Sequence, residues 1–523
     1  MEKILGKIDQ RIFWVSAVIC LLFVVWAMIA PGAVTNAFSV IFNFTIQNLG
    51  WAYMICGVLF LLFCVALAFS KYGKIKLGKD NEEPEYSTAS WFAMLFSAGM
   101  GIGLVFWGVA EPVYHFAGAP FTESGTPQAA TEAMRASFFH WGLHPWSFYG
   151  VVAMALAYFS FRKGLPGLIS STFYPILGEE GVKGPIGKTI DIIAVVCTLF
   201  GVATSLGLGV MQINGGLNFV YGLPNTIPVS LAIVAIITCL FTISAVTGIN
   251  KGIKWLSNMN MVIAFILLIF FLFAGPTRYL LNMFTESLGY YIQNIVWLSF
   301  FLDTQGEVAA RTGYDWVGAW PVFYWAWWIT WAPFVGSFIA RISRGRTVKE
   351  FVMGILVAPT LLSFLWFTFL GGTAIHMELF DKIPISEAVF SDVTSALFVT
   401  FNNLPMGQLF SLIAIVMIIT FFVTSADSAT FVVGMMTSGG NLEPKSTLKV
   451  FWGILLGFIA AMLLITGGLD AVKTVALAIG FPFTVLMMFM MYSLFKGFRH
   501  DKAINSGASA VSVDNNKSSV HHV

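Results

Sequence analysis

Charged residues are scarce in this chain of 523 residues: Asp, Glu, Lys and Arg make up 10%, whereas 58% of the residues are hydrophobic. A soluble domain has too little interior to remove so much apolar surface from water, so the composition excludes one and predicts lipid as the main solvent. The formal net charge is +2, and the basic residues are spread over short loops. Nothing in this distribution indicates a nucleic-acid-binding surface.

Cysteine is also scarce, and each of the five lies in an apolar segment: Cys20, Cys56, Cys64, Cys197 and Cys239. They show neither metal-ligand spacing nor a disulfide framework, so we interpret them as small core residues. His140 and His144 have no evident acidic partner nearby. Without a nucleophile–base pair or a set of metal ligands, we expect neither an enzyme nor a bound cofactor.

Long apolar segments dominate what is present. A helix needs about 20 apolar residues to cross a bilayer, and about twelve segments reach that length. They lie near residues 13–30, 50–70, 88–110, 137–160, 188–214, 227–247, 256–275, 315–340, 350–374, 405–433, 449–466 and 471–494. The sequence therefore predicts an all-α polytopic membrane protein.

The loops between these segments alternate in charge. Basic clusters such as 71–79 and 341–349 alternate with loops that are uncharged, such as 215–226, or acidic, such as 377–404. Basic loops face the cytoplasm, and the alternation fits an even number of spans with both termini on that side. We expect a multi-pass protein of the cell membrane.

Two regions are too polar or too short to be spans. Residues 164–187 are rich in Gly and Pro and predict a cytoplasmic loop with a short helix at most, whereas 278–312 predict an amphipathic interfacial helix on the outer side. Helices three to seven precede the second region and helices eight to twelve follow it. Because each group holds five helices, an odd number, the two groups run in opposite directions, as in inverted-repeat transporters. The predicted divisions are 1–85 for the N-terminus and two peripheral helices, 86–276 for the first repeat, 277–312 for the interfacial helix, 313–496 for the second repeat and 497–523 for a disordered cytoplasmic tail.

An unusual aromatic run occupies residues 323–334. It contains four tryptophans, including Trp327, Trp328 and Trp331, inside one apolar segment. Tryptophan in membrane proteins normally gathers at the interfaces. The faces of clustered rings suit a quaternary ammonium, which donates no hydrogen bond and is held by cation–π contact. A packed aromatic seam between helices explains the run equally well.

The first helix of each half carries helix-weakening residues. The segment 88–110 contains Gly99, Gly101 and Gly103, and the segment 315–340 contains Pro333 and Gly336. A break in a membrane-spanning helix leaves backbone groups without hydrogen bonds, and it is tolerated where these groups line a cavity. There they can bind a cation or a carboxylate. We therefore predict that both helices are interrupted and that Gly101 and Gly103 belong to a binding site. Close helix packing is the alternative.

The fourth segment supplies a facing aromatic wall. Trp141, Trp146 and Tyr149 share one helical arc, and Pro145 is expected to loosen the helix between the two tryptophans. An interfacial aromatic belt is the alternative interpretation.

The tenth segment contains adjacent hydroxyls, Thr424 and Ser425, which suit a sodium ion or simple bonding to carbonyls one turn back. Asp427, an ionisable residue in the same apolar helix, is a gating or structural candidate. We expect it to pair with an arginine of the basic loop, such as Arg341. Glu111, at the start of an acidic outer loop, is placed in the same class.

At these residues the chain resembles the betaine/carnitine/choline transporter family over essentially its whole length. The most specific matches are the runs at 325–331, 340–346 and 99–103. The resemblance implies a LeuT-type core of two inverted five-helix repeats preceded by two extra helices, assembled as a homotrimer. It also implies that the substrate is a small quaternary ammonium compound, carried with sodium through the lipid bilayer.

The resemblance further implies roles for individual residues. The trimethylammonium box matches Trp141, Trp146, Tyr149 and Trp328, and the substrate path or a second aromatic site matches Phe323, Trp327 and Trp331. The sodium site matches backbone carbonyls of Ser97, Met100 and Phe421 and the hydroxyls of Thr424 and Ser425.

Three features of the sequence discriminate within the family. Choline carriers have an acidic residue near Gly103, so glycine favours a zwitterion such as glycine betaine. Sodium-independent exchangers lack the hydroxyl pair that this chain retains. Sodium-coupled betaine members have two threonines where this chain has Thr198 and Val202, which puts a second ion site in doubt. The hypothesis is a sodium-coupled betaine symporter; the alternatives are a sodium-independent exchanger and a membrane enzyme or receptor for a quaternary amine.

Overall fold

The computed structural model describes residues 5–99, 101–247 and 250–501, and their backbone is almost entirely helical. No strand occurs in these ranges beyond one isolated bridge between Lys76 and Thr347. The helices are α2 Gln10–Ile29, α3 Pro31–Phe69, α4 Thr88–Gly99, α5 Ile102–Ala117, α6 Pro127–Trp141, α7 Leu143–Ala157, α8 Tyr174–Lys183, α9 Pro185–Tyr221, α10 Ile227–Thr247, α11 Asn250–Ala274, α12 Thr277–Phe300, α13 Glu307–Thr312, α14 Phe323–Ile342, α15 Val348–Leu379, α16 Ile385–Ser391, α17 Ala396–Asn402, α18 Gly407–Thr437, α19 Ser446–Gly467 and α20 Leu469–Arg499.

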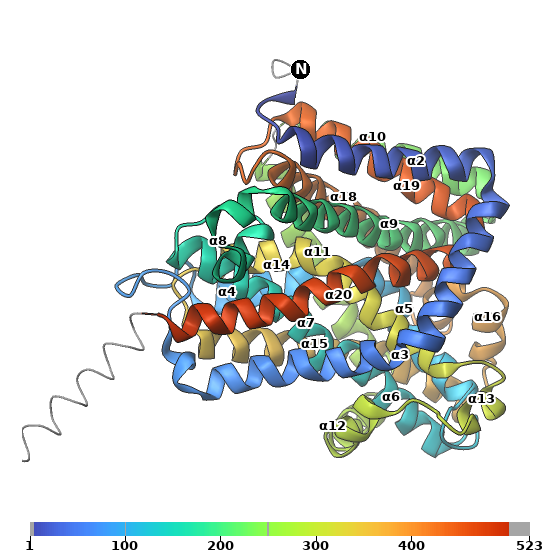
Figure 1. The fold of residues 1–523 in the computed structure, drawn as a ribbon. Helices are drawn as coiled ribbons and strands as arrows, with labels where there is room; N and C mark the ends of the chain where they lie inside the picture. The colour runs from blue at the N-terminus through green and yellow to red at the C-terminus, as the bar shows by residue number, and fades with distance from the viewer. Residues whose placement is uncertain (1–4, 100, 248–249, 502–523) are drawn as a thin grey trace, which may run out of the picture.

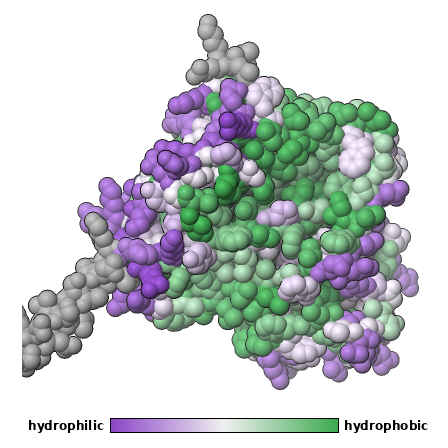
Figure 2. All heavy atoms as spheres, in the orientation of Figure 1, coloured by the Kyte–Doolittle hydropathy of each residue, from purple (hydrophilic) through white to green (hydrophobic). Residues whose placement is uncertain are grey.

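Nine helices within the described residues are long and apolar enough to cross a membrane: α2, α3, α9, α10, α11, α15, α18, α19 and α20. Large apolar side chains on them face outward; Leu22 is 63% exposed and Phe273 is 72% exposed. Figure 2 shows a broad hydrophobic surface with hydrophilic residues gathered toward its two ends. Such a surface is stable only in lipid, so the chain is a multi-pass membrane protein.

Of the other three predicted segments, 88–110 and 137–160 are present as interrupted helices, and 315–340 contains most of α14. The predicted break at the glycines is confirmed: α4 ends at Gly99, Gly101 is extended (φ −144°, ψ −173°) and α5 begins at Ile102. The fourth segment breaks at Gly142 rather than at Pro145, which lies in the first turn of α7. A Cβ at Gly142 would lie 2.4 Å from the Phe138 carbonyl oxygen, so the backbone requires glycine there. Pro145 is tolerated because first-turn amides have no intrahelical acceptor.

The predicted interruption at Pro333 and Gly336 is wrong, because α14 runs unbroken through both residues. Gly336 instead permits close packing: a Cβ there would lie 2.7 Å from a methyl carbon of Val152 on α7. The irregular backbone lies earlier, in a π-helical turn over Gly318–Val322 that joins directly to α14.

The bundle is organised around α9, which packs against α2 and α19 on one side and α20 on the other (Figure 1). Helices from the two halves of the chain also pair: α7 with α14, α5 with α15, α9 with α18 and α10 with α19. The polar region 278–312 forms α12 and α13, and α12 is seen end-on in Figure 1, across the direction of α9 and α20. The 164–187 region contains the short helix α8, as expected.

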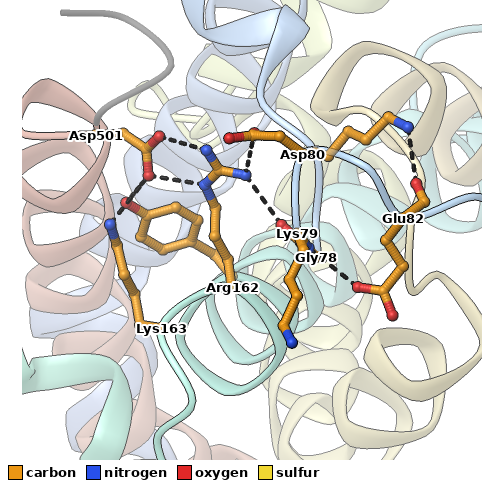
Figure 3. Close-up of polar contacts among 9 residues, drawn as sticks. Gly78, Lys79, Asp80, Glu82, Arg162, Lys163 and Asp501 are labelled. Carbon is orange, nitrogen blue, oxygen red and sulfur yellow. Dashed lines mark hydrogen bonds and ion pairs between the residues drawn. The ribbon is translucent and has the colours of Figure 1, made fainter.

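Polar clusters fasten the loops beyond the helix ends. Arg162 donates to both carboxylate oxygens of Asp501 (2.8 and 2.6 Å) and to the Gly78 carbonyl, and it pairs with Asp80 (Figure 3). Lys163 also reaches Asp501, at 3.0 Å. The last described residue, Asp501, is therefore attached to the end of the fourth segment and, through Arg162, to the loop after α3.

A second cluster joins the 75–86 loop to the 341–348 loop. The Leu77 amide donates to the Arg346 carbonyl (2.8 Å), and Arg344 pairs with Glu82 (2.5 Å). A hydrogen bond from the Lys79 amide, together with the Arg344 charge, lowers the pKa of the Glu82 carboxyl. The Arg346 guanidinium lies 4.0 Å from the centre of the Trp91 ring on α4. The basic loop is therefore bound to the start of the broken helix.

We predict that Arg162→Gln destabilises the protein by about 2 kcal/mol, because it removes the main partner of a buried carboxylate while Lys163 remains. Thermal unfolding of the purified protein, followed by tryptophan fluorescence, would show a lower midpoint. The matched control is Lys183→Gln, which breaks an ion pair with Glu179 whose side chains are 74% and 66% exposed. That variant should melt like the wild type; equal midpoints for all three proteins would contradict the prediction.

Candidate functional site

A cavity of about 760 Å³ opens between α4, α5, α11, α14 and α18. Its wall near the break consists of Gly101, Ile102, Gly103 and Leu104, and it extends to Tyr86 before α4 and to Phe338 in the second half of α14. Other lining residues are Ala93, Met94, Trp141, Tyr149, Ser205, Ser257, Asn258, Asn260, Met261, Val262, Phe265, Trp327, Trp328, Trp331, Phe334, Val335, Phe421, Thr424, Ser425 and Ser428. The interrupted helix therefore borders a cavity, as backbone freed within a membrane requires.

Four of the predicted aromatic residues come together beside this cavity. The Trp328 ring lies 5.4 Å from Trp141, 5.9 Å from Trp146 and 5.1 Å from Tyr149, measured between ring centres. Trp141, Tyr149 and Trp328 line the cavity, whereas Trp146 packs behind Tyr149 at 5.7 Å. We call these four residues the aromatic box. Its rings are tilted or edge-on to one another, which leaves ring faces available to a cation.

The other predicted aromatic residues have different surroundings. Trp327 donates its indole N–H to Ser205 (3.1 Å) and Trp331 donates to the Gly201 carbonyl (2.8 Å), both on α9. Phe323 is fully buried, does not line the cavity and stacks on Trp327 at 5.7 Å. Helix α9 therefore orients two of the cavity tryptophans.

The two glycines at the break differ in the space around them. A Cβ at Gly103 would lie 2.4 Å from the Trp327 ring and 3.2 Å from the Trp141 ring, whereas nothing lies within 4 Å of a Cβ at Gly101. Any side chain at Gly103 must therefore displace Trp327. Both residues line the cavity, but only Gly101 leaves open space there.

A buried hydrogen-bond network holds Trp141 in place. Glu111 accepts from the Trp141 indole (2.8 Å) and from the Tyr324 hydroxyl, and it contacts His140 Nδ1 at 2.7 Å. The expectation that His140 has no acidic partner is therefore wrong. The two residues are 29 positions apart, on α5 and α6, so sequence proximity gave no signal.

Glu111, His115 and His140 bring their ligand atoms within 4.8 Å of one another and could hold a metal ion. One Glu111 oxygen already contacts His140 Nδ1 (2.7 Å) and the other accepts from Trp141 and Tyr324, whereas His115 Nε2 has no hydrogen-bond partner in the described residues. A metal would have to replace the contact between His140 and Glu111, so the arrangement favours a structural network beside the box.

The residues proposed for sodium are only partly described. Met100 lies outside the described residues, and of Ser97 the structure describes only its place in the last turns of α4. Phe421, Thr424 and Ser425 all line the cavity. The Thr424 hydroxyl donates to the Thr420 carbonyl (2.9 Å), as the simpler interpretation expected. This bond uses the hydroxyl proton and leaves the oxygen lone pairs available to a cation.

Asp427 does not have the predicted partner. It forms no ion pair within the described part of the chain, and one of its buried carboxylate oxygens accepts no hydrogen bond there. Arg344 pairs with Glu82, Arg346 lies over Trp91, and Arg341 is exposed. The docking of the basic loop onto the 75–86 loop keeps these arginines away from α18.

Residues 11–503 match the sequence profile of the betaine/carnitine/choline family transporters. The chain is 50% identical over 494 residues to the glycine betaine transporter OpuD of Bacillus subtilis, covering 94% of this chain and 95% of the relative. It is 44% identical to a probable glycine betaine transporter of Desulfitobacterium hafniense (96% and 100% covered) and 44% identical to an ectoine/hydroxyectoine transporter of Virgibacillus pantothenticus (93% and 96% covered). The chain is a multi-pass transporter, not an enzyme, and belongs to the betaine/carnitine/choline transporter family.

Proposed function

We propose that the chain is a sodium-coupled symporter that imports glycine betaine or a related zwitterionic quaternary ammonium solute. The observation that carries the proposal is the aromatic box, in which three rings surround Trp328 at 5.1–5.9 Å beside a cavity of about 760 Å³. A trimethylammonium group donates no hydrogen bonds, so ring faces in a dry site bind it better than polar groups do. The names of the relatives, glycine betaine transporters, agree with this chemistry.

The proposed architecture is the LeuT-type fold with about twelve spans. The pairing of the two halves supports it: α14 packs on α7 and α5 packs on α15, so the first helix of each half lies against the second helix of the other. The third helices of the two halves, α9 and α18, pack on each other, and so do the fourth helices, α10 and α19. This pattern stays the same when the two halves are exchanged. In this architecture the repeats are 86–276 and 313–496, and the two peripheral helices lie in 1–85. Both termini would face the cytoplasm, and the transporter would assemble as a homotrimer.

Sodium is proposed to bind between the break in the α4–α5 helix and α18. The Thr424 and Ser425 hydroxyls and the Phe421 carbonyl would be ligands from α18, and the carbonyls of Ser97 and Met100 would complete the shell. Oxygen-only ligation suits a hard cation. The presence of the hydroxyl pair in the cavity wall supports this arrangement. No further cofactor is proposed.

Coupling follows if sodium stabilises the state that is open outward and the substrate then favours closure. The cavity in the structure extends toward Tyr86 and Phe338, at the end where the basic loop lies. On the other side the Trp141 and Trp327 rings meet over Gly103. This asymmetry supports rocking of one helix group against the other around a central site, with this conformation open toward the basic loops.

The proposal predicts sodium-driven accumulation. In proteoliposomes clamped at fixed voltage, labelled betaine should concentrate inside when sodium is higher outside and should only equilibrate when potassium replaces it. A sodium-independent exchanger would instead require internal substrate and ignore the sodium gradient. Competition by unlabelled ectoine would test whether the wider specificity suggested by one relative's name applies here. Absence of net accumulation under every condition would exclude a symporter.

Trp328→Leu should weaken betaine binding about tenfold, because it removes the ring central to the box and a desolvated cation–π contact contributes up to about 2 kcal/mol. Equilibrium binding of labelled betaine to purified protein measures the change. Trp51→Leu is the matched control, since this ring on α3 is 54% exposed and does not line the cavity. Equal affinities in all three proteins would contradict the aromatic box.

Thr424→Val should raise the sodium concentration for half-maximal uptake about tenfold or more, because it removes one ligand from the ion while conserving side-chain volume. Thr430→Val is the control: this threonine is also buried on α18, makes the same kind of intrahelical bond (2.9 Å to the Asp427 carbonyl) and does not line the cavity. Sodium titrations of betaine uptake separate the two. A shift of the same size in both variants would indicate only a loosened helix.

A further inference from the structure

An aromatic cage distinct from the box holds a lysine of the protein itself. The Nζ atom of Lys473, in the second turn of α20, lies 5.5 Å from the centre of the Trp107 ring, 5.5 Å from Trp320 and 5.2 Å from Phe323. We call Trp107, Trp320 and Phe323 the outer cage. All three rings are buried, and Trp107 and Trp320 meet at 5.5 Å in an edge-on arrangement.

The outer cage lies one helical turn beyond the substrate cavity, on the side away from Tyr86. Trp107 follows the cavity residue Gly103 by four positions on α5, and Phe323 precedes Trp327 by four positions on α14. The Trp327 ring, stacked on Phe323, lies between the outer cage and the cavity. A solute passing from the far side of the protein to the cavity would therefore meet the outer cage first.

The lysine is held by ring faces rather than by an ion pair. Asp470 on its own helix and Glu111 on α5 are the carboxylates close enough to act on its charge. Within the described residues neither forms an ion pair with it; the Glu111 oxygens instead accept from Trp141 and Tyr324. In addition, the buried Trp107 indole N–H has no hydrogen-bond acceptor in the described part of the chain. A cation, ring faces and an unused donor thus occur together.

These groups suit a zwitterion and oppose a simple cation. The rings bind a quaternary ammonium, while the lysine ammonium and the free indole N–H suit a carboxylate. A substrate carrying both groups can take the place of Lys473 over the rings and pair with the displaced ammonium. A substrate that carries only the positive charge must approach a like charge without compensation.

We propose that Lys473 and the outer cage form a selectivity site on the outer path, which admits quaternary ammonium solutes bearing a carboxylate and disfavours cationic ones such as choline. The inference rests on the proposed function, because it assumes that such solutes are transported. It assigns Lys473 a specificity role separate from that of Gly103, which lies in the cavity wall beyond Trp327.

The test is Lys473→Met, which removes the charge and keeps an apolar chain, with Lys473→Arg as the control that keeps the charge. In proteoliposomes, the concentrations of unlabelled choline and unlabelled betaine that halve labelled betaine uptake are measured for each protein. The ratio of the half-inhibiting choline concentration to the half-inhibiting betaine concentration measures selectivity. We expect this ratio to fall about tenfold in Lys473→Met and to stay near the wild-type value in Lys473→Arg. Because a ratio is compared, the amount of active protein cancels.

If Lys473→Met does not reach the membrane, Lys473→Gln supplies the same neutralisation with a polar head group and carries the same expectation. An unchanged ratio in the neutral variant would overturn the selectivity role and leave Lys473 as a structural cation. Failure of the proposed function is recognised separately, because the wild-type protein would then accumulate no betaine in the same vesicles.

Discussion

The lipid core provides no water to satisfy a backbone amide or carbonyl, and this constraint governs where the chain can depart from a helix. The extended residue at the α4–α5 break, Gly101, lines the cavity, where a solute, water or an ion can reach the freed groups. The break at Gly142 lies between two helices that carry the box, Trp141 on one and Trp146 on the other. Both helix breaks therefore lie beside residues of the site.

Ring orientation around the cavity depends on polar contacts to neighbouring helices. Trp141 is held by Glu111, Trp327 by Ser205 and Trp331 by the Gly201 carbonyl. Each indole N–H thus donates to an acceptor on another helix, while the tryptophan itself lines the cavity. A buried carboxylate is costly in lipid unless it is hydrogen-bonded, and Glu111 meets this condition by collecting bonds from both the box and Tyr324.

Arginine and lysine have different tasks at the two ends of the molecule. Arg162, Arg344 and Arg346 fasten loops to one another through carboxylates, carbonyls and the Trp91 ring. Lys473 lies against three aromatic rings without an ion pair in the described residues. A guanidinium suits fixed bidentate contacts, whereas a compact ammonium on a flexible stem can be displaced. The first arrangement suits permanent attachment, and the second suits a site that a solute must enter.

The sequence by itself determined the all-helical membrane class, the positions of the apolar segments and the break at the glycines, because segment length, hydrophobicity and glycine content are local properties. It also indicated that Trp141, Trp146, Tyr149 and Trp328 belong together, through their spacing and the family resemblance. Only the tertiary structure decided that α14 continues through Pro333, that His140 meets Glu111 and that Arg344 meets Glu82 instead of Asp427. These outcomes depend on which helices and loops become neighbours: Gly336 serves a contact with α7, and the arginines follow the loop to which their backbone is hydrogen-bonded. Such neighbours are set by packing over the whole bundle, and no local pattern in the chain encodes them.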